Sequence, residues 1–311
     1  MDSKDILIIS QVFPPDPASV GQYLFDFATE MARRGFQIGV LTSQEGYDQP
    51  LDKYPERETI GNIEIIRIKN TSFGKKNNFS RLKGHILFCL KTLYLICFKL
   101  HFRSVLITTV PPISSVIGLF LVLFSRKPLF YWVMDINPDQ IVALGLAKEN
   151  STIVKIFDSV NGFVLSRAKI IITLDNNMKD TLERKSNKGI NIFVIPPWAH
   201  DNVRFIEKKN NNIEYIKKLS LENRFIVMYS GNHSPSNPLD TLLKIVEEMK
   251  EDNSIVFLFV GGGTEKSKVE DLQKEDFLTC FPYLIKVSKG SMNFWQLPIY
   301  MLLLSEKKWS G

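Results

Sequence analysis

Short apolar runs alternate along the chain with longer stretches in which apolar residues recur every three or four positions. The first pattern is typical of buried strands and the second of helices with one buried face. In the first 200 residues they predict strands at 5–10, 36–42, 62–68, 105–109, 129–134, 169–173 and 192–195. The strand at 62–68 alternates, which indicates an edge or half-buried strand. Helices are predicted before Gly35 and at about 81–102, 113–125, 152–167 and 176–186, with Gly35 as a C-terminal cap and Asp175 as an N-cap.

The same pattern restarts in the second part of the chain. After "IPPWAHDN" (195–202) and a polar run (207–212), it predicts a strand at 225–229, a helix at 238–250, a strand at 255–260 and a helix at 265–273. Strands that alternate with helices predict a mostly parallel sheet covered on both faces. We therefore expect an α/β protein with two Rossmann-like domains, 1–200 and 201–311, which face each other across a cleft.

The second domain is expected to be incomplete. Only about three strands are predicted there, against about seven in the first domain, and the last of them is expected at 281–287. The composition changes after Lys286, which suggests a premature or altered reading frame.

Two segments bear on targeting. The N-terminus "MDSKDILIIS" lacks the long apolar core of a signal peptide. Residues 104–125 carry no charge, but Pro111 and Pro112 divide them into a strand-like run and a helix too short to cross a bilayer. No spanning helix is predicted.

Composition and charge narrow the function only a little. The chain is 44% hydrophobic and 23% charged, as a soluble globular protein is, and its net charge of +6 suits an anionic substrate or a membrane surface. Its three cysteines and four histidines show neither metal-ligand spacing nor a disulfide framework, so we expect no metal site and a reducing compartment.

Two loops of the first domain could carry chemistry. Gly21 opens a helix after the first strand, where a glycine lets backbone approach an anionic ligand or simply forms a turn. Asp135 follows an apolar strand directly, where a sheet presents functional side chains. Alternatively, Asp135 or Asn137 caps a helix.

Two loops of the second domain resemble phosphate-binding turns. "YSGNHSPSNPLD" offers the amides of Gly231 and Asn232 and the imidazole of His233, and backbone donors of this kind suit a diphosphate. "FVGGGTEKSK" follows the next strand with Gly262, Gly263 and the nearby cation Lys266. Each loop alone could be an ordinary turn, and a lone loop histidine is more often exposed than functional.

Several common motifs are missing. The sequence has no Walker-type GxxxxGK[ST], no GxGxxG and no GxSxG in a suitable context, and its aromatic and basic residues are not interleaved as in nucleic-acid-binding proteins. The missing GxGxxG argues against a nicotinamide-dependent oxidoreductase, and no nucleic acid is expected as a partner.

The motifs "RRGFQIGVLTS", "VPPISSVIG", "WVMDINPD", "VIPPW", "YSGNHS" and "FVGGG", in this order, resemble the family 4 type of retaining glycosyltransferases. The similarity extends over about residues 5–285 and is greatest to bacterial enzymes of O-antigen, capsule or exopolysaccharide synthesis. It implies a GT-B fold with an acceptor-side first domain and a nucleotide-sugar-binding second domain. It also implies sugar transfer with retention, without a metal or other cofactor, to a lipid-linked or glycan acceptor in the cytoplasm.

The resemblance also assigns roles to residues. Asp135 would lie near the reacting sugar, and Gly21 near the donor phosphates and acceptor. Gly231, Asn232 and His233 would contact the donor diphosphate, with Gly262, Gly263 and Lys266 beside it.

The sequence departs from the family pattern in two places. The loop "GNHSPSNP" lacks the Arg and Lys that members often have there, and the family's C-terminal Glu…Glu region has no counterpart. The alternative function is therefore a truncated, catalytically inactive relative that acts at most as a binding protein.

Residues 81–103 combine a broad apolar surface with Lys83, Lys91, Lys99 and Arg103. Such a helix can lie on an anionic bilayer, which suits peripheral contact with the inner face of the cytoplasmic membrane. The other interpretation is a core helix with solvated lysines.

Overall fold

A computed structural model of the chain describes residues 3–16, 18–46, 53–71, 78–186, 189–198, 224–231, 233–235, 238–274 and 280–283. The chain divides into two compact units, 1–197 and 198–311. Each unit is described by itself.

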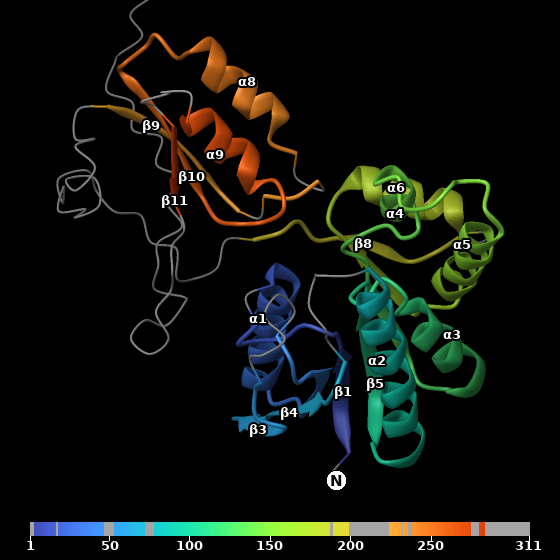
Figure 1. Ribbon diagram of the computed structural model, residues 1–311. Coiled ribbons are helices and arrows are strands. Elements are labelled where there is room, and N and C mark those ends of the chain that lie inside the picture. The colour runs from blue at the N-terminus through green and yellow to red at the C-terminus, as the bar shows by residue number, and fades with distance from the viewer. Residues whose placement is uncertain are drawn as a thin grey trace, which may run out of the picture. The chain divides into compact units, whose positions relative to one another are not determined.

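Unit 1 is built on an eight-stranded sheet (Figure 1). Its strands are β1 (Lys4–Ile9), β2 (Ile38–Ser43), β3 (Arg57–Ile60), β4 (Ile63–Ile68), β5 (Phe102–Thr108), β6 (Leu129–Trp132), β7 (Ile170–Thr173) and β8 (Ile192–Val194). They lie in the order β3-β4-β2-β1-β5-β6-β7-β8. Every pair is parallel except β3–β4. Since parallel strands end at one edge, the loops after β1, β5 and β6 meet there.

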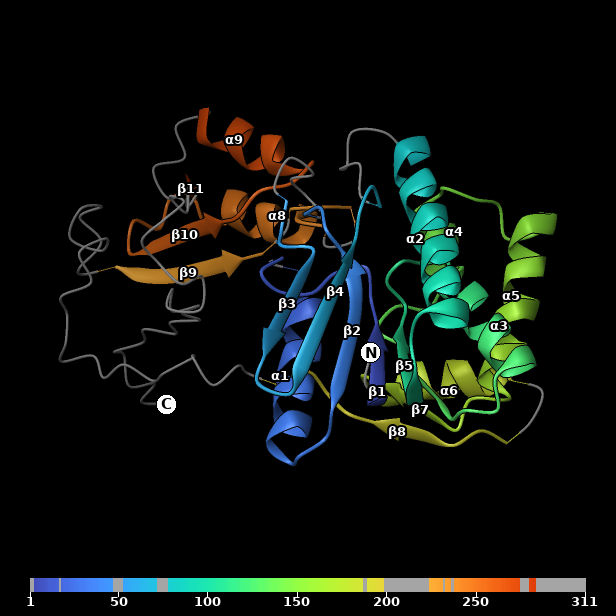
Figure 2. The ribbon, with the colours of Figure 1, turned by 90° about the horizontal axis from the view of Figure 1, so that it is seen from below.

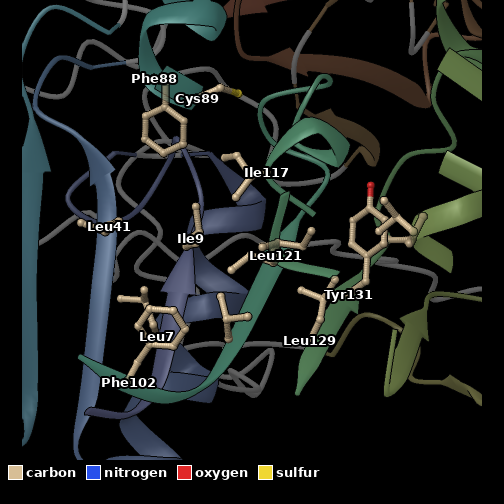
Figure 3. Close-up of a cluster of buried hydrophobic side chains, with 14 of the residues drawn as sticks. Leu7, Ile9, Leu41, Phe88, Cys89, Phe102, Ile117, Leu121, Leu129 and Tyr131 are labelled. Atoms are coloured by element: carbon tan, nitrogen blue, oxygen red, sulfur yellow. The ribbon is translucent and has the colours of Figure 1, made fainter. Parts of the chain in front are cut away.

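The helices of unit 1 are α1 (Ser19–Arg33), α2 (Asn78–Phe98), α3 (Ser115–Phe124), α4 (Asp139–Ala143), α5 (Thr152–Leu165) and α6 (Asn176–Lys185). Side chains of α2, α3, α5 and α6 pack with one face of the sheet into a single apolar core. Figure 3 shows part of it, with Phe88, Cys89, Ile117 and Leu121 against Leu7 and Ile9. This packing is what holds the carboxyl ends of the central strands in place.

Local sequence signals explain several boundaries. The Asp175 carboxylate accepts a hydrogen bond from the Met178 N–H at 2.8 Å, so Asp175 is the N-cap of α6 as predicted. Gly35 follows α1 with φ +92°, a conformation that favours glycine at a helix C-terminus. Residues 104–125 contain the end of β5 and then α3, which confirms the predicted strand, turn and short helix.

Two elements differ from the sequence prediction. β3 was not predicted, and because it pairs with β4, the strand at 63–68 is half-buried but is not a sheet edge. The five-residue helix α4 was expected only in the alternative interpretation, as a helix capped by Asp135 or Asn137; it forms, but its N-cap residue is Pro138, without a side-chain cap hydrogen bond. Both elements are too short for a clear periodicity.

Unit 2 contains a three-stranded parallel sheet of β9 (Phe225–Ser230), β10 (Ile255–Val260) and β11 (Cys280–Tyr283), in the order β11-β10-β9. In the part of unit 2 that the structure describes, the helices are α8 (Asp240–Glu248) and α9 (Lys266–Lys274). Leu243 and Val246 of α8 and Val269 of α9 are buried with Phe257 and Phe259 of β10. Unit 2 thus has its own core. The rest of the predicted strand at 281–287, after Tyr283, lies outside the described residues.

Among the described residues, no helix is both long and apolar enough to cross a membrane.

Candidate functional site

In unit 2 the loops that follow β9 and β10 are joined through their backbones. The Gly231 N–H donates to the Val260 carbonyl at 2.9 Å, and the His233 N–H donates to the Gly262 carbonyl at 2.9 Å. The Glu265 N–H in turn donates to the His233 carbonyl at 3.0 Å. The two loops therefore form one structure at the start of α9, which we call the unit 2 cradle (residues 231, 233 and 261–266).

Glycines make this close approach possible. A Cβ at Gly261 would overlap the Gly231 carbonyl oxygen, and Gly261 has φ +139°. Gly263 has φ +147°, which is also unfavourable for other residues. The N–H groups of Gly262 and Gly263 have no acceptor among the described residues, so they are available to a ligand. A Cβ at Gly262 would meet nothing within 4 Å, so the space beside it is open.

His233 is fully buried at the base of this cradle. Its ring lies 5.5 Å from the Tyr229 ring and 6.4 Å from the Phe259 ring, between centroids. Neither ring nitrogen has a hydrogen-bond partner among the described residues. Burial and the nearby Lys266 charge lower the His233 pKa, so the imidazole is neutral at pH 7 with one N–H to donate.

Lys266 supplies the positive charge of the cradle. It is the first residue of α9, only 17% of its side chain is exposed, and its Nζ lies 2.9 Å from the Glu270 carboxylate. A helix N-terminus favours anions, because its first N–H groups have no partners within the helix. Free glycine amides, a neutral imidazole and an ammonium group together can bind a phosphate or diphosphate.

The structure thus brings together five of the six residues predicted in this half: Gly231, His233, Gly262, Gly263 and Lys266. The sixth, Asn232, lies outside the described residues. The Gly231 N–H is already engaged by Val260, so among the described residues of this prediction the available backbone donors are those of Gly262 and Gly263.

In unit 1, Asp135 lies in the loop between β6 and α4. The Thr109 hydroxyl oxygen accepts hydrogen bonds from the Met134 and Asp135 N–H groups, both at 3.2 Å. The Gln140 side-chain amide donates to the Asp135 carboxylate at 3.0 Å. Partial burial raises the Asp135 pKa, and the Gln140 hydrogen bond opposes this shift. The carboxylate is therefore fixed in position, and no cation holds it in the described structure.

Gly21 lies in the first turn of α1 and packs against the loop after β1. A Cβ at this position would stand 3.1 Å from the Phe13 Cα and 3.2 Å from the Phe13 nitrogen. The space that the absent Cβ leaves beside Gly21 is therefore occupied by the backbone of Phe13.

A polar network links the loops at this edge of unit 1. The Gln11 N–H donates to the Val110 carbonyl at 2.9 Å, which ties the loop after β1 to the loop that carries Thr109. The Gln11 side-chain amide donates to the Thr71 carbonyl, and its oxygen lies 2.8 Å from His85 Nδ1. Burial, assisted by the Arg81 charge, lowers the His85 pKa to about 4. His85 is therefore neutral and donates through Nδ1.

Sequence reasoning missed three residues of these sites. Thr109 was visible only as the last polar residue before Pro111, and Gln140 only as a residue five positions after Asp135. Tyr229 pairs with Phe259 across adjacent strands, and a strand period of two could have placed both beside the loops.

The described residues contain no group of three or more His, Cys, Asp or Glu side chains that could hold a metal ion.

Comparison with known proteins gives one curated relative of interest. The chain is 20% identical over 168 residues to the probable glycosyltransferase WbjE of Pseudomonas aeruginosa. The match covers 53% of this chain and 42% of the relative, so the matched part spans less than half of that protein. No protein-family model matches the sequence.

Three solved structures are similar over most of the chain. Sucrose-phosphate synthase from Thermosynechococcus elongatus has a TM-score of 0.65 and 18% identity, with 88% of this chain and 68% of that one covered. WaaG, a glycosyltransferase involved in lipopolysaccharide biosynthesis, has a TM-score of 0.60 and 13% identity (90% and 69% covered). Anabaena HepE in complex with UDP-glucose has a TM-score of 0.58 and 15% identity, with 89% of this chain and 66% of that one covered.

These likenesses agree with the two Rossmann-like units, and the predicted fold is confirmed: the chain has the GT-B type of α/β fold.

Proposed function

We propose that the chain is a glycosyltransferase that moves a hexosyl-type sugar, with retention, from a nucleotide-sugar donor to a lipid-linked or polysaccharide acceptor. The observation that carries this proposal is the unit 2 cradle: free glycine amides, neutral His233 and Lys266 at the carboxyl ends of two adjacent parallel strands. In a GT-B fold, the ligand expected at such a cradle is the diphosphate group of a nucleotide sugar.

The cradle suits the chemistry of a departing diphosphate. During transfer the bond between the anomeric carbon and the phosphate oxygen breaks, and the diphosphate keeps the electron pair. The acceptor oxygen bonds to the same carbon, and its proton passes to an oxygen of the departing diphosphate. Since the carbon passes through an oxocarbenium-like state, charge must be stabilised on both sides. The Gly262 and Gly263 N–H groups and Lys266 would stabilise the leaving phosphates without a metal or other cofactor.

The unit 1 residues complete the proposal. Asp135 is assigned to the reacting sugar, because a partly buried carboxylate held by Gln140 and Thr109 can orient a sugar hydroxyl or stabilise positive charge. Gly21 is assigned to the loop that borders the donor and acceptor. Residues 1–200 would then serve the acceptor and residues 201–311 the donor.

The relatives support the finer parts of the proposal. HepE was solved with UDP-glucose, and WaaG is involved in lipopolysaccharide biosynthesis. We therefore propose a role in cell-surface polysaccharide synthesis. The enzyme would act in the cytoplasm, with peripheral contact to the inner face of the cytoplasmic membrane through residues 81–103, whose basic and apolar side chains suit an anionic bilayer.

The test is donor binding and turnover by the full chain. We expect UDP or another nucleoside diphosphate to bind in calorimetric titrations, and Lys266→Gln to weaken that binding about tenfold, because it removes a partly buried cation. Lys268→Gln is the matched control, since Lys268 is more exposed and is already paired with Asp240 and Glu265. Equal loss in both variants, or no binding of any nucleoside diphosphate, would contradict the donor site.

A second candidate function is a binding protein without transferase activity. The sequence favours it at one point, because the loop "GNHSPSNP" lacks the Arg and Lys that the resembling enzymes often have there. Such a protein would still bind the nucleoside diphosphate at Lys266. Sugar-nucleotide hydrolysis and sugar transfer would both be absent.

A further inference from the structure

Helix α2 exposes a continuous line of large apolar side chains. Leu82, Ile86, Leu90, Tyr94 and Phe98 recur every four residues and are between 43% and 73% exposed. The opposite side of the same helix carries Phe88 and Cys89 into the core shown in Figure 3. The exposed line is therefore a second apolar face, beyond the one that α2 needs to fold onto the sheet.

The neighbouring helices also expose large apolar side chains. α3 contacts both α2 and α5, and Figures 1 and 2 show the three helices together on one side of unit 1. α3 exposes Val116, Leu123 and Phe124, and α5 exposes Ile153 and Ile156, from 41% to 73%. We call these ten side chains of α2, α3 and α5 the apolar helix face. A monomer rarely leaves so many large apolar residues in contact with water on neighbouring helices.

The charge around α2 and α3 has one sign. The chain has 33 acidic residues, yet none lies between Ile65 and Met134, the stretch that contains α2 and α3. The same stretch contains eleven basic residues: Arg67, Lys69, Lys75, Lys76, Arg81, Lys83, Lys91, Lys99, Arg103, Arg126 and Lys127. Lys83, Lys99, Arg126 and Lys127 are exposed, and so is Lys155 beside Ile156 on α5.

This combination decides between possible occupants. A second copy of the chain would bring two basic surfaces together, which like-charge repulsion disfavours. A bilayer that contains anionic lipid offers both an apolar interior and negative head groups. We propose that the apolar helix face docks on an anionic phospholipid bilayer, with α2, α3 and α5 at the surface and their lysines and arginines among the head groups.

This inference deepens the proposed function, because a docked unit 1 would be held at the surface where a lipid-linked acceptor is found. It extends the expectation from residues 81–103: three helices form the face, and α2 spans Asn78–Phe98. Vesicle binding needs neither donor nor acceptor. A chain without transferase activity could still bind vesicles, and an active transferase could fail to bind them.

The experiment is flotation of the full chain with vesicles of phosphatidylcholine alone or with about one third phosphatidylglycerol. We expect binding to the anionic vesicles at low salt and weaker binding at high salt, because salt screens the head-group charge. Lys99→Glu with Arg126→Glu should weaken partitioning by roughly fivefold or more for each basic charge lost. Lys244→Glu with Lys250→Glu, two exposed lysines of unit 2, should leave binding unchanged.

The apolar part is tested by Leu90→Ser with Phe98→Ser, against Phe36→Ser with Ile60→Ser as a matched exposed pair elsewhere in unit 1. We expect the first pair to lose most vesicle binding while its circular dichroism stays unchanged, and the second pair to bind as the unaltered chain does. Absence of binding to anionic vesicles at low salt would overturn the proposal. A dimer that Phe98→Glu dissociates, without vesicle binding, would assign the face to a second copy instead.

Discussion

The carbonyl oxygen of Gly231 faces Gly261 so closely that a Cβ on residue 261 would overlap it. Gly261 also has φ +139°, a backbone conformation that residues other than glycine rarely adopt. We therefore expect Gly261→Ala to force the two loops apart and to lower the free energy of unfolding by about 2 kcal/mol or more. Urea unfolding monitored by circular dichroism measures this change.

Gly262→Ala is the control for that substitution. A Cβ on Gly262 would meet nothing within 4 Å, and its φ lies outside the strained positive range. We expect its stability to stay within about 0.5 kcal/mol of the unaltered chain. If both alanine variants unfolded at the same urea concentration, this result would contradict the close packing of the two loops.

Secondary structure could be predicted from the sequence because its signals are local. Asp175 caps α6 through the Met178 N–H, and an N-cap residue before an apolar periodicity is visible without a structure. β3 was missed because Arg57–Ile60 is short and depends on its partner β4. Such pairing is set by tertiary contacts.

The positions of the candidate sites could be predicted from the sequence, but their hydrogen bonds and burial could not. The loops after β9 and β10 were expected to lie together, since parallel strands end at one edge. That Val260 engages the Gly231 amide, and that His233 is fully buried where a loop histidine is usually exposed, depends on contacts between residues far apart in the sequence. For Gly21, the contact with the Phe13 backbone could not be foreseen from a glycine near a strand end.

Asp135→Asn tests the proposed role of the carboxylate. The amide keeps the size of the side chain but loses its charge, so we expect the rate of sugar transfer to fall about 100-fold or more while the fold is retained. The initial rate of product formation from a nucleotide-sugar donor measures the effect. Asp139→Asn is the control: Asp139 is an exposed neighbour paired with Lys185, which keeps Asp158 as a second partner. Unchanged transfer by the Asp135 variant would remove this residue from the site.

Arg67 tests how the loop after β1 is held. Its guanidinium is fully buried, donates to the Pro14 carbonyl at 2.9 Å and to the Pro55 carbonyl at 3.0 Å, and pairs with Glu58 at 2.9 Å. Arg67→Met would leave both carbonyls without this donor, so we expect a loss of about 2–4 kcal/mol in unfolding free energy. Lys69→Met is the control, since Lys69 forms an exposed pair with Glu56. Similar midpoints in thermal unfolding for both variants would contradict the buried role of Arg67.

His85 should make the stability of unit 1 depend on pH. Its pKa falls from 6.5 to about 4 in the folded chain, chiefly because the imidazole is buried beside Gln11. Between pH 6.5 and 4 the unfolded chain therefore binds a proton that the folded chain does not, so stability decreases as pH falls through this window. The full shift corresponds to about 3 kcal/mol.

His85→Gln removes the titrating group, and the unfolding free energy of this variant should lose that part of the pH dependence. His101→Gln, at an exposed histidine, should keep it. Urea unfolding at pH 7, 6, 5 and 4.5 compares the three chains, and identical slopes for all of them would contradict the burial of a neutral His85.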